Sequence, residues 1–371
     1  MRITFISPPV NFGGGTKVIV IYAQHLQRMG HTVRIVSPPP LKLNLSRKIK
    51  SWLNGNGWIS DLSRSRSHLD GSGVDHHILD RYRAVTDDDV PDGDVVIATW
   101  WLTAEWVARL SARKGAKVYF IQGHEIHGHL PVARSQATYR FAFHKIAVAQ
   151  WLKQVMTEQY GDNVVDVVPN SVDRTQFFAP LRGKQLVPTA GFLYAHGNVK
   201  GVDSTLAALR IVRKRVPRLH IVSFGSQRPD SRSPLPKHVE FFHLPSQDKI
   251  RNLYARCDVW ISASRSEGFN LPALEAMACR TPVVATRTGW PEEAVESHWN
   301  GILVDVDDVN GLAQGVEWVL TRSDEDWRTL SANAYATASA GSWQESAKLF
   351  EGALEHARVR AKRGEIFGYT R

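Results

Sequence analysis

Short apolar runs and longer segments of helical periodicity alternate along most of the chain. Runs at residues 3–6, 33–36, 95–98 and 118–121 predict buried strands, and segments such as 17–29 and 202–212 predict helices between strands. The same alternation resumes at residue 188 and includes further strands at 220–224, 239–242 and 259–261. Strands that alternate with helices in this way are typical of α/β proteins with parallel sheets.

The chain has 371 residues, which is more than one hydrophobic core normally holds, so we expect two domains. Pro180 and Gly183 mark a linker by their composition. We therefore expect an N-terminal domain at residues 1–180 and a C-terminal domain at 181–345. A final helix, from Gln344 to about Lys362, accounts for most of the segment 346–371.

Composition narrows the classes of function. The two cysteines, Cys257 and Cys279, lie in sequence contexts that look buried and fit a reducing cytoplasm. We expect no secretory signal and no transmembrane helix, because no apolar run approaches ~20 residues. The formal net charge of +10 suits an anionic partner such as a nucleotide diphosphate, a lipid phosphate, a membrane surface or a nucleic acid. We do not expect a nucleic-acid binder, because the chain has no recognised basic and aromatic module.

Residues 41–70 interrupt the alternation of strands and helices. Leu45, Ile49 and Trp52 recur at helical spacing, while Arg47 and Lys48 fall on other faces. This pattern is typical of a basic amphipathic helix on an anionic membrane surface. The alternative is a helix packed on its own domain with a solvated basic face. We expect the rest of the segment to be a loop that covers a bound acceptor.

Two carboxylates separated by seven residues follow the strand at 259–261. Glu267 falls in the loop after this strand, and Glu275 falls in the helix expected at 271–279, which Pro272 opens. In parallel α/β sheets ligands bind at such loops, and helix starts attract phosphate groups. Acidic acceptors beside a phosphate site suit a nucleotide sugar. The alternative is that Glu267 is solvated and Glu275 merely complements the helix dipole.

Two loops of the N-terminal half are further candidates. The glycines at 13–15 follow the first strand, where glycine lets backbone amides approach a phosphate, although neither the P-loop nor the dinucleotide spacing is present. The missing dinucleotide spacing disfavours a dehydrogenase. The segment after the strand at 118–121 contains His124, His127 and His129 with an adjacent glutamate. Its spacing fits zinc poorly, so we interpret it as an active-site loop rather than a metal site or a surface histidine cluster.

The segment 264–286 closely resembles the signature of the retaining GT-B glycosyltransferases of family four. That signature reads Glu-Gly-Phe-Gly-Leu-Pro, then Glu-Ala-Met-Ala, then Gly-Thr-Pro-Val-Val, and this chain departs from it at Asn270 and Arg280, which replace glycines. Asparagine tolerates the left-handed backbone that glycine often supplies, so we expect the loop to keep its shape. The chain also has the Lys200-Gly201 pair of the family, but Phe192 occupies the place of the usual arginine.

The resemblance implies a GT-B fold, in which two Rossmann-like domains with parallel sheets face each other across a cleft. The N-terminal domain would bind an acceptor, the C-terminal domain would bind the nucleotide sugar, and the segment 346–371 would cross back to the N-terminal domain. Carried over residue by residue, the resemblance implies catalytic roles for Glu267 and His124. The donor-binding residues that it implies are Gly14, Gly15, Lys200, Gly268, Phe269, Asn270, Leu271 and Glu275. Arg265 and Arg228 are our candidates for the missing cation, and His196 is a weaker one.

The activity implied is transfer of a sugar, most simply a hexose, to an acceptor hydroxyl with retention of anomeric configuration. The donor would be linked to UDP or GDP, the acceptor would be a sugar or a lipid-linked sugar, and no metal or other cofactor would be required. Polysaccharide or glycolipid assembly in the cytoplasm or at the inner face of the membrane is the expected setting. The alternatives are a GT-B nucleotide-sugar epimerase and a non-catalytic GT-B-like binding protein.

Overall fold

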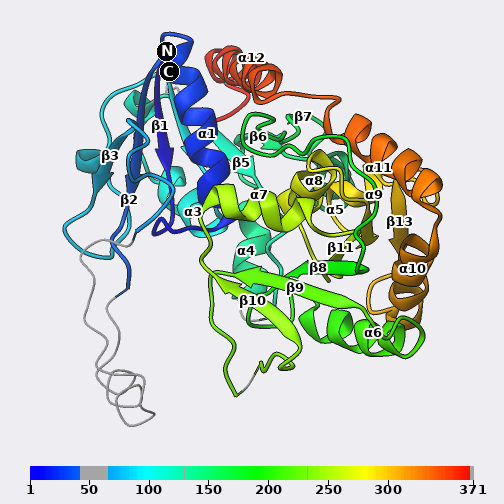
Figure 1. Ribbon diagram of the computed structural model, residues 1–371. Helices are drawn as coiled ribbons and strands as arrows, with labels where there is room; N and C mark the ends of the chain where they lie inside the picture. Colours follow the sequence, from blue (N-terminus) through cyan, green and yellow to red (C-terminus); the bar gives the residue numbers. More distant parts are fainter. Residues whose placement is uncertain (42–65, 129, 232, 368–371) are drawn as a thin grey trace. The chain divides into compact units, whose positions relative to one another are not determined.

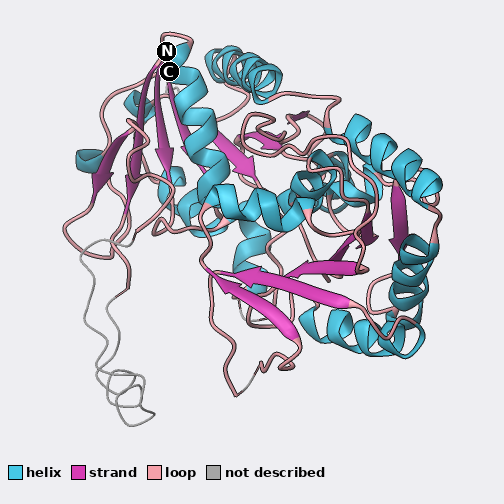
Figure 2. Ribbon diagram, viewed as in Figure 1, coloured by secondary structure: helices cyan, strands magenta, loops and turns pink. Residues whose placement is uncertain are grey.

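The computed structural model describes residues 1–41, 66–128, 130–231 and 233–367, and the chain divides into two compact units (Figures 1 and 2). The N-terminal unit comprises Met1–Val148, Leu152–Val168 and Ala347–Arg371, and the C-terminal unit comprises Ala149–Trp151 and Pro169–Ser346. The expected basic amphipathic helix, with Leu45, Ile49 and Trp52, lies outside the described residues, and so does most of the loop expected in the rest of segment 41–70. Among the helices that the structure describes, none is both long and apolar enough to cross a membrane.

The N-terminal unit contains a seven-stranded parallel sheet in the order β3-β2-β1-β4-β5-β6-β7. Its strands are β1 (Arg2–Ile6), β2 (Thr32–Ser37), β3 (Asp75–Ile78), β4 (Val95–Ala98), β5 (Ala116–Ile121), β6 (His144–Ala147) and β7 (Val165–Val167). Its helices are α1 (Gly14–Arg28), α3 (Trp101–Ala108), α4 (Val132–Thr138), most of α5 (Gln150–Tyr160) and most of α12 (Trp343–Lys362), with short 3-10 turns at Asp87–Asp89 and Ala112–Lys114. All residues of β4, β5 and β6 are buried, as expected for parallel strands with both faces covered.

An aromatic cluster joins the end of the chain to the core of the N-terminal unit. The ring of Phe350, on α12, stacks on Tyr22 of α1 with a centroid distance of 4.5 Å. It also lies 5.0 Å from Phe120 and 6.1 Å from Phe5, measured between ring centroids. Such aromatic pairs add to the free energy of area burial. The last helix is therefore part of this core.

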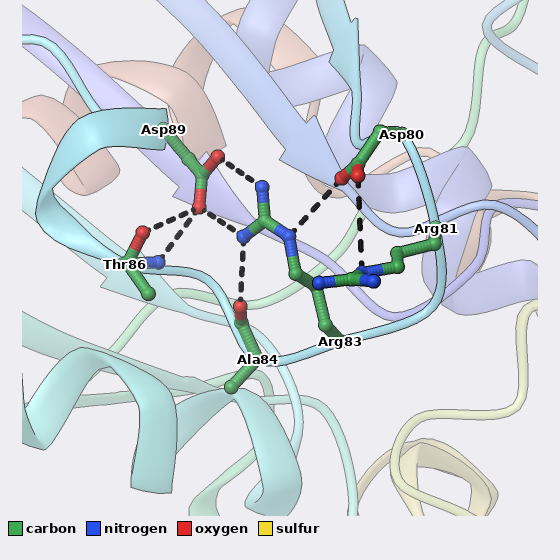
Figure 3. A network of polar contacts seen from close by, with 6 residues as sticks. All are labelled: Asp80, Arg81, Arg83, Ala84, Thr86 and Asp89. Carbon is green, nitrogen blue, oxygen red and sulfur yellow. Dashed lines mark hydrogen bonds and ion pairs between the residues drawn. The ribbon is translucent and has the colours of Figure 1, made fainter.

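A polar network stabilises the connection between β3 and β4 (Figure 3). The guanidinium of Arg83 donates two hydrogen bonds to the carboxylate of Asp89, of 2.6 and 2.7 Å, and a third of 3.1 Å to Asp80. Asp89 also accepts from the backbone N–H of Thr86, which caps the 3-10 turn. The hydrogen bonds from Arg83 outweigh burial and lower the pKa of Asp89 to about 2.

The C-terminal unit contains a six-stranded parallel sheet in the order β10-β9-β8-β11-β12-β13. Its strands are β8 (Thr189–Leu193), β9 (His220–Gly225), β10 (Val239–His243), β11 (Val259–Ser262), β12 (Val283–Thr286) and β13 (Gly301–Val304). Its helices are α6 (Val202–Arg215), α7 (Gln247–Ala255), α8 (Leu271–Ala278), α9 (Trp290–Ala294), α10 (Val309–Thr321) and α11 (Asp324–Ala338). The strand order reverses between β8 and β11, and such a reversal is where α/β sheets bind ligands. The expectation of two parallel-sheet, Rossmann-like domains is confirmed.

Candidate active site

Lys200 and Glu267 meet at the reversal of strand order in the C-terminal unit. Lys200 lies in the loop after β8, and Glu267 lies in the loop after the neighbouring β11. The Lys200 ammonium donates to Oε1 of Glu267 over 2.5 Å, and the Ser264 hydroxyl donates to the same oxygen over 2.7 Å. Both side chains line one small pocket, in which the Lys200 side chain is 28% exposed and that of Glu267 is 10% exposed. The ion pair therefore remains reachable by a ligand.

Two glycines allow the loops of this pocket to approach one another. Gly201 has a left-handed backbone with φ +58°, and a Cβ at this position would lie 1.8 Å from the main-chain oxygen of Ala263. Gly289 has φ +65°, and a Cβ there would lie 2.9 Å from the Cβ of Glu267. Any larger residue would have to push the Glu267 loop away from its neighbours. The glycines thus position the loop that carries Glu267.

Asn270 keeps the left-handed backbone expected of it, with φ +84° and ψ +59°, and it caps α8. Its side-chain oxygen accepts a hydrogen bond from the N–H of Ala273 over 3.4 Å, and its side-chain nitrogen donates to the hydroxyl of Ser262 over 2.8 Å. The side chain is buried and linked to the end of β11. The replacement of glycine by asparagine therefore provides an N-cap.

Glu275 is buried and accepts a hydrogen bond from a side chain of the neighbouring helix α7. Its Oε2 accepts from the hydroxyl of Tyr254, on α7, over 3.0 Å. Burial raises the pKa of Tyr254 well above its usual value, so the phenol keeps the proton that it donates. Glu275 is the fifth residue of α8, beyond the first turn, so a role in complementing the helix dipole does not account for its position.

The other predicted donor-binding residues of the C-terminal unit offer mainly backbone atoms. The ring of Phe269 is buried and stacks on Trp290 at a centroid distance of 5.7 Å. Leu271 is also buried and opens α8 next to Pro272. A ligand at this loop would therefore contact the main chain around Gly268 rather than the Phe269 and Leu271 side chains.

The side chain of Arg265 is already paired with acids. Its guanidinium donates to Asp203 over 2.8 and 2.9 Å, and it lies 2.7 Å from Asp307. It also donates to the main-chain oxygen of Asn198 over 2.8 Å. Phe192, at the position of the family's arginine, is buried in the core of the unit and is 1% exposed. Within this unit Lys200 is therefore the described cation that contacts Glu267.

The N-terminal unit places the glycine loop beside the segment that follows β5. Helix α1 begins at Gly14, three residues before the predicted start, so Gly14 and Gly15 form its first turn. A Cβ at Gly15 would lie 3.7 Å from the side chain of Gln122. The first turn of α1 and the segment after β5 are therefore close neighbours.

His124 is buried and is held by tyrosines. Its Nε2 shares a hydrogen bond of 2.7 Å with the hydroxyl of Tyr160, and its ring lies 5.5 Å from that of Tyr139, measured between centroids. Burial lowers the pKa of His124, so the imidazole is neutral at neutral pH. His127 lies in the same loop, and His129 lies outside the described residues. In the described part of the chain this loop forms no cluster of metal ligands.

Glu125 is a candidate to which sequence reasoning gave no role. Its carboxylate accepts the backbone N–H of Trp101, the first residue of α3, over 3.0 Å. Desolvation outweighs this hydrogen bond and raises the pKa of Glu125 to about 8. The carboxyl group is therefore protonated over much of the neutral range and can donate as well as accept. In the sequence, the position of Glu125 directly after His124 was the signal that could have marked it as a candidate site residue.

Comparison with known structures shows the class of fold. Sucrose-phosphate synthase from Thermosynechococcus elongatus superposes with a TM-score of 0.70 at 16% identity, over 97% of this chain and 100% of that one. Anabaena HepE, in complex with UDP and glucose, superposes with a TM-score of 0.68 at 17% identity, over 96% of this chain and 100% of that one. The chain has the GT-B fold.

Residues 184–322 match the family described as glycosyl transferases group 1. A curated relative, the D-inositol 3-phosphate glycosyltransferase of Corynebacterium jeikeium, is 36% identical over 129 residues, which are 34% of this chain and 30% of that protein. The chain spans 30% to 40% of the length of several such relatives. The matched segment lies within the C-terminal unit, and it contains Lys200, Glu267 and Glu275.

Proposed function

We propose that the protein transfers a sugar from a nucleotide-sugar donor to an acceptor hydroxyl. The observation that carries this proposal is the meeting of Lys200 and Glu267 at the reversal of strand order, inside a domain that matches group 1 glycosyltransferases. Parallel sheets bind nucleotides at this place. A cation for a diphosphate and carboxylates for sugar hydroxyls are the groups that such a donor needs.

In the proposed donor complex Glu275 accepts hydrogen bonds from the ribose hydroxyls, and Tyr254 holds its carboxylate in position. The ammonium of Lys200 turns from Glu267 toward the diphosphate, with which it forms charge-assisted hydrogen bonds. Glu267 is then left to interact with the transferred sugar. The main chain at Gly268 and the first amides of α8 contact the phosphates.

The proposed reaction retains the configuration at the anomeric carbon. The bond between this carbon and the diphosphate oxygen breaks, and a bond to the acceptor oxygen forms on the same face. The proton of the acceptor hydroxyl passes to the leaving diphosphate. Lys200 and the α8 amides stabilise the charge that develops on this leaving group, which is commonly the largest catalytic term. These residues supply that stabilisation without a metal ion, and we propose none.

A UDP- or GDP-linked hexose is the proposed donor, and HepE, with its UDP and glucose, supports the first of these. The acceptor is proposed to be a sugar or a lipid-linked sugar, as in polysaccharide or glycolipid assembly at the cytoplasmic side of a membrane. The N-terminal unit is proposed to bind the acceptor. By resemblance, His124 of this unit is a candidate catalytic residue, and Gly14 and Gly15 are candidates for donor binding.

A donor screen tests this proposal. The melting temperature is measured with UDP, GDP, ADP and their sugar derivatives, and we expect one nucleotide to raise it through ligand linkage. NMR then follows the chosen donor with candidate acceptors and reports the configuration of the product. Inversion of configuration would contradict the proposed mechanism, and turnover of the donor without an acceptor would favour an epimerase.

Two variants separate binding from turnover. Glu275→Ala should raise the KM for the donor, while Glu267→Gln should mainly lower kcat. Glu317→Gln is the matched control, because this carboxylate pairs with Arg215 at the surface of the same unit. Wild-type kinetics in both site variants would overturn the assignment, and silence with all nucleotides would favour a non-catalytic protein.

A further inference from the structure

The C-terminal unit has a second pocket that shares no residue with the pocket of Lys200 and Glu267. It lies along α6, and β9 and the segment before β10 complete its walls. Its volume is about 520 Å³, within the usual range for sites that bind small molecules. All the residues that line it belong to the described part of the chain. The pocket is therefore large enough for a ligand of its own.

Apolar side chains form most of the surface of this pocket. Leu206 and Leu209 contribute from α6, Ile221 contributes from β9, and Leu235 contributes from the segment before β10. Leu206 and Leu235 are only partly buried against the hydrophobic core. They leave apolar surface open to solvent, and burial of that surface would favour an apolar ligand.

The charged residues of the pocket are separated along the helix. Asp203, Leu206, Arg210 and Arg213 have the spacing of one helix face. Asp203 and Arg213 are ten residues apart, or about 15 Å at the rise of an α-helix. The carboxylate of Asp203 is occupied by Arg265, whereas the two arginines stand at the other end. A ligand along α6 would thus have its negative group near Arg213 and its neutral part toward Leu206.

Arg213 has an unused hydrogen-bond donor at this basic end. Its Nε is buried and has no hydrogen-bond partner among the described residues. A buried donor without a partner is destabilising, so the guanidinium would gain a hydrogen bond by turning its Nε toward an anion in the pocket. Complementing the helix dipole is the simplest structural role for basic residues at a helix end. Arg215 has such a surface role and pairs with Glu317 over 2.7 Å, but this does not account for the buried Nε of Arg213.

His238 also favours an anion at the Arg213 end of the pocket. It lines the pocket, and burial together with the charge of Arg213 lowers its pKa. Both side chains line this pocket. A neutral imidazole can donate one hydrogen bond to an anion beside Arg213.

We propose that this pocket binds a small amphipathic anion, a medium-chain carboxylate, with its aliphatic chain on Leu206 and Leu235 and its carboxylate on Arg213. A nucleotide fits poorly, because the apolar lining would leave most of its polar groups without partners. The proposal is independent of the sugar-transfer activity, since it uses none of the residues assigned to that reaction.

Calorimetric titration of the full chain tests the proposal. Decanoate is the probe, decanol is its neutral counterpart, and vesicles of phosphatidylglycerol test whether a membrane lipid is preferred. We expect decanoate to bind with one site per chain and more tightly than decanol. Arg213→Gln should weaken decanoate by about tenfold, the usual effect of one hydrogen bond to a charged group. Leu235→Glu should abolish binding, because it places a charge on the apolar wall.

Arg215→Gln is the matched control, because it removes an arginine from the same helix outside the pocket and should leave the affinity unchanged. Circular dichroism melts verify that each variant is folded, and Arg213→Lys replaces Arg213→Gln if the latter unfolds. The lysine keeps the charge but lacks the Nε donor, so it should still weaken binding. The proposal is wrong if decanoate does not bind, if decanol binds equally well, or if binding is seen only with vesicles. It is also wrong if both Arg213 variants keep the wild-type affinity, or if Arg215→Gln loses as much affinity as they do.

Discussion

The hydroxyl of Tyr254 donates to the carboxylate of Glu275 over 3.0 Å, and so connects α7 to the candidate donor site. Both side chains are buried, and they come from positions 21 residues apart in the sequence. If Tyr254 positions Glu275 for the ribose, then the geometry of α7 contributes to donor affinity without touching the donor.

The variant Tyr254→Phe tests this relationship. It keeps the buried ring and removes only the hydroxyl, so we expect the KM for the donor to rise by about tenfold, the cost of one charge-assisted hydrogen bond, with little change in kcat. Tyr194→Phe is the control, because it removes a buried hydroxyl that donates to Ser233 elsewhere in the unit. Equal effects in the two variants would show that the role of Tyr254 is only structural.

Asn270 stabilises the protein as an N-cap and destabilises it through its left-handed backbone conformation. Two substitutions separate these two contributions to the free energy of unfolding. Asn270→Ala removes the cap and keeps the left-handed strain, so it should lower the free energy of unfolding by about 2 kcal/mol. Asn270→Gly relieves the strain and should cost about 1 kcal/mol or less. Urea denaturation measures both. If alanine proves as stable as glycine, the left-handed backbone is not a source of strain.

Glu125 should make the folded protein less stable as the pH rises into the alkaline range. Its pKa in the folded protein is raised to about 8, so folding favours the protonated form. The stability that this contributes is complete below the usual pKa of a glutamate and is lost as the pH rises toward 8. Glu125→Gln should therefore be more stable than the wild type at pH 9, by about 2–4 kcal/mol. Melting curves at pH 5 and pH 9 test this, and a constant difference between the two proteins would contradict it.

His144 should make the folded protein less stable as the pH falls into the acid range. It is buried, its Nε2 contacts Asp166 over 3.0 Å, and its Nδ1 lies 3.1 Å from Arg360 of α12. Burial, with smaller effects of His356 and Arg360, lowers its pKa despite the opposing effect of Asp166. Folding thus favours neutral His144, and this stability is lost as the pH falls below about 6.5, where the unfolded state binds the proton. Asp166 stays ionised here, because the hydrogen bonds from His144 and His356 overcome burial and lower its pKa to about 2.

The test is the slope of unfolding free energy against pH between 7 and 5. His144→Gln should reduce that slope by about 1 kcal/mol across the interval. His77→Gln, at an exposed position of β3, should leave it unchanged. A slope equal to that of the wild type in His144→Gln would exclude this account of the cluster of His144, Asp166 and His356.

The alternation of apolar and polar residues was sufficient to predict most of the fold. The strand at β11, the helix α8 and the strand at β12 follow from apolar runs, a proline in the first helical turn and the residues between them. By contrast β3 was not predicted, because Asp75–Ile78 has one apolar residue and lies at the edge of its sheet. Helix α4 was also missed. Such elements depend on contacts that local periodicity does not report.

The residues of the candidate site were predicted by resemblance. The side chains with which they pair could not be predicted, because those pairs depend on tertiary contacts. The sequence places Arg265 two residues before Glu267, but its pairing with Asp203 and Asp307 depends on loops far apart in the chain. The replacement of glycine by Arg280 has a clear structural account. Arg280 has a left-handed backbone with φ +60°, a conformation that glycine adopts more easily. Its guanidinium lies 4.1 Å from the ring centroid of Tyr335. The cation–π contact offsets part of the strain.

The aromatic cluster around Phe350 also has a consequence for how the chain is made. Phe5 and Tyr22 leave the ribosome before the C-terminal unit does, but their partner on α12 is synthesised more than 300 residues after them. During translation the whole C-terminal unit emerges while the N-terminal core still lacks this ring. The C-terminal unit can therefore complete its fold first, although its synthesis begins second.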